Sequence, residues 1–121
     1  MIEHAVKELP NECCGVLPGR NNAVERVVPM RSIPPSPDAY FMDPLQQLDV
    51  FTEMEKRGET LLGIYHSHPG GPLQLSGADL QLVFHPEAFY FVVSLENREN
   101  PEVGAFMLKE GKFKEIKIEY I

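Results

Sequence analysis

Proline and glycine residues divide this chain into segments that are too short for long helices or long strands. The 121 residues include 11 prolines and 9 glycines, and proline ends a helix and interrupts the hydrogen bonding of a sheet. Between these breaks, hydrophobic residues recur at helical intervals or form short apolar runs. The pattern predicts helices at 1–9, 44–58 and 76–84, and strands at 13–17, 23–30, 60–65, 89–95, 103–108 and 113–118.

The predicted elements follow one another as helix, two strands, helix, strand, helix and three strands. This order implies a mixed β-sheet with helices packed against it, which places the chain in the α/β class. A length of 121 residues fits one compact domain. We therefore expect a single domain over residues 1–121, with the most apolar strand, 89–95, near the centre of the sheet.

Composition excludes several classes of function. The formal net charge of −7 disfavours binding to nucleic acid through phosphate contacts. No apolar run approaches the roughly 20 residues that cross a membrane, and the charged residues Glu3, Lys7 and Glu8 are unlike a secretory signal. The two cysteines, Cys13 and Cys14, are adjacent, which excludes a disulfide framework and a cysteine-rich zinc site. We expect a cytoplasmic protein that binds neither nucleic acid nor membrane.

Two histidines, His66 and His68, follow a predicted strand and are separated by one residue. Side chains two residues apart on a strand point to the same face, so both imidazoles can bind one metal ion. After a loop rich in glycine and proline, Asp79 lies in the first turn of the predicted helix 76–84 and can supply a carboxylate. Two histidines and one carboxylate leave one tetrahedral position open, which is typical of catalytic zinc.

The same residues also have a simpler interpretation. A pair of histidines on a strand is weak evidence for a metal, and Ser76 with Asp79 three residues later fits the capping of a helix N-terminus. Taken alone, that pair is better explained by capping. Both interpretations can hold together, because a helix N-terminus also stabilises negative charge. The metal hypothesis depends on the histidine pair, the intervening loop and the Ser76–Asp79 pair occurring in combination.

The combined pattern resembles the signature of the JAMM (MPN+) metalloproteases: His66-Ser67-His68-Pro69, followed at the family's spacing by Ser76 and Asp79. An upstream segment, residues 10–17, resembles the glutamate-bearing N-terminal segment of the same family. The resemblance extends over nearly the whole chain in the right order. It implies the MPN/JAB fold of the small stand-alone prokaryotic members, a mixed sheet flanked by helices that is similar to the cytidine deaminase fold.

The resemblance assigns roles to individual residues. It implies that His66, His68 and Asp79 bind one Zn²⁺ ion. It also implies that Glu12 is the general base that takes a proton from the zinc-activated water, and that Ser76 helps to stabilise the oxyanion. Composition does not distinguish Glu12 from the other glutamates, so its role depends on the resemblance alone.

The resemblance also implies a substrate class. It predicts a metallo-(iso)peptidase that hydrolyses a bond after the C-terminal tail of a ubiquitin-like or sulfur-carrier protein, and it is compatible with a homodimer. The alternative is a non-catalytic MPN scaffold or interaction module, because metal-free relatives of this fold serve in assembly. Such relatives lack some of the metal ligands, whereas this chain keeps all the matching positions together with Glu12. This difference favours the enzyme.

Overall fold

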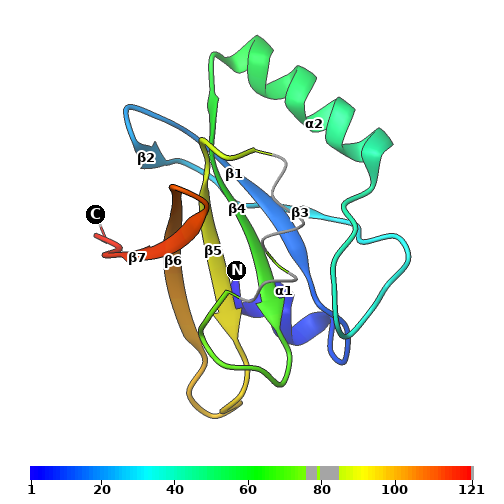
Figure 1. Ribbon diagram of the computed structural model, residues 1–121. Helices are drawn as coiled ribbons and strands as arrows, with labels where there is room; N and C mark the ends of the chain where they lie inside the picture. The colour runs from blue at the N-terminus through cyan, green and yellow to red at the C-terminus, as the bar shows by residue number, and fades with distance from the viewer. Residues whose placement is uncertain (76–78, 80–84, 121) are drawn as a thin grey trace.

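A computed structural model describes residues 1–75, 79 and 85–120. Within this part of the chain, seven strands form one sheet and two helices lie beside it (Figure 1). The elements in chain order are α1 (Ile2–Lys7), β1 (Cys14–Arg20), β2 (Ala23–Val24), β3 (Val28–Met30), α2 (Pro44–Arg57), β4 (Thr60–His68), β5 (Phe89–Ser94), β6 (Glu102–Lys109) and β7 (Lys112–Ile116). Neither of the described helices is long and apolar enough to cross a membrane.

The sheet has the strand order β2-β1-β4-β5-β6-β7, and β3 also pairs with β1. The neighbouring strands are antiparallel except for β4 and β5, which run parallel. β5 lies near the middle of this order, as its apolar sequence predicts. The structure therefore confirms the predicted α/β class with a mixed sheet.

The longer helix, α2, begins and ends as the sequence predicts. The Asp43 side chain accepts a hydrogen bond from the Leu45 N–H at 3.0 Å, and Pro44 occupies the first turn. Gly58 ends the helix with a left-handed φ of 69°, a conformation that glycine adopts without steric cost. Arg31 donates to the Asp43 carboxylate at 2.9 Å, which ties the start of α2 to the segment after β3.

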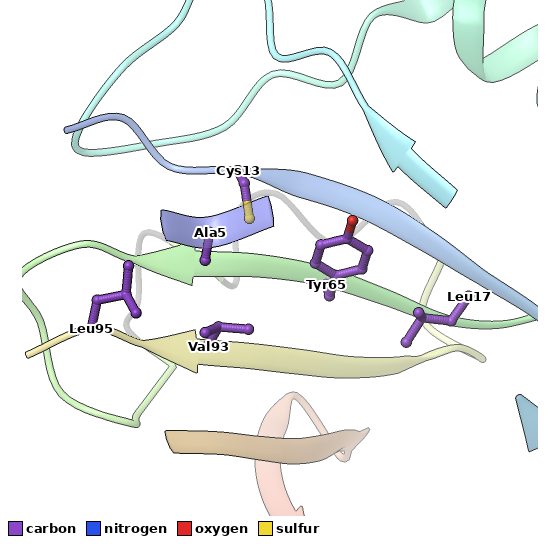
Figure 2. Packing of buried hydrophobic residues seen from close by; sticks show 6 residues of the cluster. All are labelled: Ala5, Cys13, Leu17, Tyr65, Val93 and Leu95. Carbon is purple, nitrogen blue, oxygen red and sulfur yellow. The ribbon is translucent and has the colours of Figure 1, made fainter. Parts of the chain in front are cut away.

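Each face of the sheet carries its own hydrophobic cluster. Figure 2 shows the cluster that includes α1, formed by Ala5, Cys13, Leu17, Tyr65, Val93 and Leu95. The cluster on the α2 side is formed by Cys14, Val16, Met30, Tyr40, Ile64 and Tyr90, with Val50 and Phe51 of α2 packed against it. Consecutive residues of a strand point to opposite faces, so the adjacent free cysteines each belong to a different cluster.

The predicted continuous strand 23–30 is wrong, because the structure has the two short strands β2 and β3 in its place. Their pairing registers with β1 differ by one residue. Pro18 of β1 lies between Val16, which pairs with β3, and Gly19, which pairs with β2. It has no N–H to donate, while its carbonyl accepts from the Glu25 N–H at 3.0 Å. The backbone between β2 and β3 therefore does not pair with β1 as a continuous strand.

Other predicted elements differ in extent or lie beyond the description. β1 and β4 each continue three residues past their predicted ends, so that β4 includes His68, and α1 is shorter than the predicted helix 1–9. The predicted helix 76–84 falls outside the described residues except for Asp79 and cannot be compared. The predicted hairpin around Glu110 and Gly111 is confirmed as the pair β6 and β7.

Gly15 of β1 lies against the ring of Tyr65, its cross-strand partner on β4. A methyl group at this position would overlap the buried ring, so Gly15→Ala should lower the free energy of unfolding by about 1–3 kcal/mol. Gly70→Ala is the control, because a Cβ atom there meets open space. Urea unfolding followed by circular dichroism measures the difference. Equal stability of the two variants would contradict this packing.

Candidate metal centre

The end of β4 places His66 and His68 with both rings on the same face of the sheet. Their Nε2 atoms lie 3.2 Å apart, and only 1% of the His66 surface is exposed. Asp79 completes the group, because its Oδ1 lies 3.2 Å from His66 Nε2 and its Oδ2 lies 3.3 Å from His68 Nε2. The structure thus brings together the three side chains that the sequence pattern predicts as metal ligands.

These three side chains suit a metal ion in geometry and in chemistry. One donor atom from each of them lies within 4.8 Å of the other two. Two imidazole nitrogens and a carboxylate oxygen form a donor set that Zn²⁺ accepts, and three protein ligands leave a position for water or substrate. Each imidazole must present a lone pair to the ion, so the location of each ring proton matters.

Hydrogen bonding determines where His68 carries its proton. Its Nδ1 lies 3.0 Å from the Pro72 carbonyl oxygen, which can only accept, so Nδ1 donates. In the neutral ring, Nε2 then keeps the lone pair that a metal requires. Burial lowers the pKa of His68, but the hydrogen bonds to Asp79 and Pro72 and the nearby carboxylates raise it above its ordinary value. Burial dominates for His66 and lowers its pKa, which favours the neutral ring.

The pairing of β1 with β4 brings Glu12 to the metal centre. Cys14 pairs directly with His66, and the same register continued by two residues places Glu12 opposite His68. Residues two apart on an extended segment point to the same face, so Glu12 faces the side of the sheet that carries both histidines. The residue that the family resemblance singles out therefore lies beside the predicted metal ligands.

Glu12 is held in a buried position. Only 6% of its surface is exposed, and its Oε1 has no hydrogen-bond partner among the described residues. Burial raises the pKa of Glu12 to about 7, the nearby His68 lowers it, and the charges of Asp79 and Asp38 add to the increase. The Glu12 N–H donates to the Ser36 carbonyl at 2.8 Å, which fixes its backbone. A carboxyl group with this pKa can gain and lose a proton near neutral pH.

Ser67, between the two histidines, connects β4 to Cys13, the residue just before the start of β1. Its Oγ accepts from the Cys13 N–H at 2.8 Å, and its N–H donates to the Cys13 carbonyl at 3.2 Å. These two bonds hold the histidine pair at a set distance from Glu12. The sequence analysis missed this role, because strand alternation indicates only that Ser67 faces away from the histidines and does not identify its partner.

The metal centre borders a cavity of about 290 Å³. The residues that line this cavity are Glu12, Pro37, Asp38, His68, Pro69, Gly70, Gly71 and Asp79. The Ser94 hydroxyl donates to the Gly71 carbonyl at 2.7 Å, which holds the loop after β4 against β5. Ser76, which the resemblance predicts to stabilise an oxyanion, lies outside the described residues.

Sequence comparison finds related proteins over most of the chain. A model of the family described as prokaryotic homologs of the JAB domain matches residues 1–109. A probable TtuB-protein conjugate cleaving protease of Thermus thermophilus is 44% identical over 110 residues, which are 90% of this chain and 70% of that protein. The CysO-cysteine peptidase of Mycobacterium tuberculosis is 34% identical over 113 residues, which are 92% of this chain and 77% of that protein. The desampylase of Pyrococcus furiosus is 34% identical over 108 residues, which are 88% of this chain and 74% of that protein.

Two solved structures resemble the chain over nearly its whole length. The solution structure of a protein from Desulfitobacterium hafniense gives a TM-score of 0.87 at 38% identity, covering 98% of this chain and 84% of that one. The crystal structure of a JAB1/MPN domain protein from Archaeoglobus fulgidus gives a TM-score of 0.62 at 20% identity, covering 99% and 86%. At 20% identity, the similarity to the Archaeoglobus fulgidus protein supports the fold alone.

Asp79→Ala tests the metal centre, because it removes the carboxylate that contacts both histidines. The variant should retain much less zinc than the unchanged protein, since one of three protein ligands is lost. Asp49→Ala, which alters an exposed carboxylate on α2, is the matched control and should retain zinc fully. Elemental analysis after zinc loading and gel filtration gives the metal content. Full zinc content in Asp79→Ala would leave this carboxylate with a capping role only.

Proposed function

Because the chain belongs to the family of prokaryotic homologs of the JAB domain, we propose that it is a zinc-dependent peptidase acting after the C-terminal tail of a ubiquitin-like or sulfur-carrier protein. The predicted JAMM resemblance is confirmed by the family match, and the named peptidase relatives make the chain a JAMM-type hydrolase. Two of these relatives are named for CysO-cysteine and for TtuB-protein conjugates, which supports a small carrier protein as the substrate.

The position of Glu12 is the observation that carries this proposal. Its buried carboxyl group and the side chains of His68 and Asp79 border the same cavity. Burying Glu12 Oε1 without a hydrogen-bond partner among the described residues costs free energy, and a role as a scaffold alone does not explain that cost. A general base beside a metal centre explains the cost. The geometry therefore favours hydrolysis over the interaction module.

In the proposed mechanism, His66, His68 and Asp79 hold one Zn²⁺ ion. Zinc bound there would make a water molecule more acidic and would polarise the scissile carbonyl group. Glu12 takes the proton of the attacking water and delivers it to the leaving amine. Burial makes the Glu12 carboxylate a stronger base than an exposed glutamate, which favours its accepting the proton. We propose that Ser76 donates a hydrogen bond to the developing oxyanion.

The surroundings of Glu12 leave room for an extended substrate. Glu12 borders the cavity of about 290 Å³ at the metal centre, and it also borders a second cavity of about 700 Å³. The second cavity lies between α1 and the segment 29–35. We propose that a peptide passing Glu12 uses the space of both cavities.

The function is tested with ubiquitin-like and sulfur-carrier proteins from the same genome, each extended at its C-terminus by cysteine, by a short peptide or by an isopeptide-linked lysine. The zinc-loaded protein should cut at least one of them directly after the tail, which intact-mass measurement reports. A chelator should abolish the cleavage and added zinc should restore it. Absence of cleavage in every substrate by fully zinc-loaded protein would contradict the proposal. Comparing cleavage of the three kinds of extension identifies the type of bond that the protein hydrolyses.

Glu12→Gln should retain zinc but lose turnover, because the amide keeps the shape of the side chain and cannot accept a proton. The expected loss in kcat is about 10²–10⁴-fold, the usual contribution of a general base. Glu55→Gln, which changes an exposed glutamate on α2 that borders neither cavity, is the control and should cleave normally. Intact-mass kinetics and metal analysis are run on the same preparations. Substantial turnover by Glu12→Gln would assign the proton transfer to another group.

A further inference from the structure

The two histidines of the metal centre differ in how their second ring nitrogen is held. His68 Nδ1 donates to the Pro72 carbonyl at 3.0 Å. His66 Nδ1 is buried and has no hydrogen-bond partner within the part of the chain that the structure describes. A hydrogen bond at this nitrogen normally fixes the ring orientation of a histidine ligand. Among the described residues, a contact other than a hydrogen bond at Nδ1 therefore has to orient the His66 ring, and the His68 ring meets it edge-on, with centroids 5.0 Å apart.

The ring of Tyr40 is in position to provide that contact. The Tyr40 and His66 rings are stacked, with centroids 4.8 Å apart and an angle of 29° between their planes. Both residues are buried, with 7% and 1% of their surfaces exposed. Stacking restrains the plane of the imidazole, and with it the direction of the Nε2 lone pair, without using either ring nitrogen.

The segment that carries Tyr40 is held by its own hydrogen bonds. The Ile33 N–H donates to the Phe41 carbonyl at 2.7 Å, and the Phe41 N–H donates to the Ser32 hydroxyl at 2.8 Å. These bonds close the loop that runs from β3 to α2 (Figure 1). Because Phe41 follows Tyr40 directly, the backbone beneath the stacked ring is fixed.

We propose that Tyr40 is a positioning residue that orients His66 for metal binding through ring stacking. Tyr40 acts through His66, since it is not among the residues that line the cavity at the metal centre. This inference rests on the proposed metal site, and it adds a residue that neither the histidine spacing nor the JAMM signature identified. Loss of the aromatic face should free the His66 ring and weaken metal binding although all three ligands remain.

Two substitutions separate the ring from its hydroxyl group. Tyr40→Leu removes the aromatic face but keeps an apolar side chain, and Tyr40→Phe removes the hydroxyl only. Competition with a chromophoric chelator measures zinc affinity, which should fall by about 10-fold or more in Tyr40→Leu, the scale for losing a contact that orients a ligand. Tyr40→Phe should bind zinc like the unchanged protein. If Tyr40→Leu does not fold, Tyr40→Met, which keeps more volume, replaces it.

Cobalt(II) substitution provides a readout that general destabilisation would not change. The absorption bands of the bound ion report ligand geometry, and they should shift in Tyr40→Leu but not in Tyr40→Phe. Phe51→Leu is the matched control, because Phe51 packs on the same cluster but its ring contacts His85. This control should lower the melting temperature while leaving zinc affinity and the cobalt spectrum unchanged.

Three results would overturn the positioning role of Tyr40. They are unchanged zinc affinity in Tyr40→Leu, an equal loss in Tyr40→Phe, and an equal loss in Phe51→Leu. Failure of the unchanged protein to bind zinc at all would instead overturn the proposed metal site, and this inference with it. The behaviour of the unchanged protein thus distinguishes failure of the proposed function from failure of this inference.

Discussion

The pairing of β1 with β4 is the constraint on which the candidate site depends. The observed register, continued by two residues, places Glu12 opposite His68. Side chains alternate between the faces of a sheet, so a slip of one residue would turn Glu12 away from the histidines. The two hydrogen bonds between Ser67 and Cys13 oppose such a slip at the point nearest the site. Backbone pairing therefore determines the distance between the proposed base and the proposed metal ligands.

Features that depend on neighbours along the chain could be predicted from the sequence. Strand alternation placed His66 and His68 on one face, and capping rules located the ends of α2 at Asp43 and Gly58. Each of these depends on the chemistry of a few consecutive residues. The class of fold followed for the same reason, because the order of the elements implied a mixed sheet.

Features that depend on long-range pairing could not be predicted from local patterns. Ser67 and Cys13 are 54 positions apart, and nothing in either segment identifies the other as its partner. Only the family resemblance identified Glu12, because strand periodicity does not distinguish one glutamate from another. In each case the decisive contact joins segments that are distant in sequence.

The loop between β3 and α2 connects these long-range features. Its Ser36 carbonyl accepts from the backbone of Glu12, its residues Pro37 and Asp38 line the cavity, and its Tyr40 ring stacks on His66. Burial is the largest cause of the raised pKa of Glu12, and Pro37 and Asp38 of this loop line the same cavity as Glu12. A looser loop would expose the carboxyl group and return its pKa toward the ordinary value, while the His66 ring would lose its stacked partner. The sheet thus determines where the proposed base and the proposed ligands lie, and this loop determines their environment.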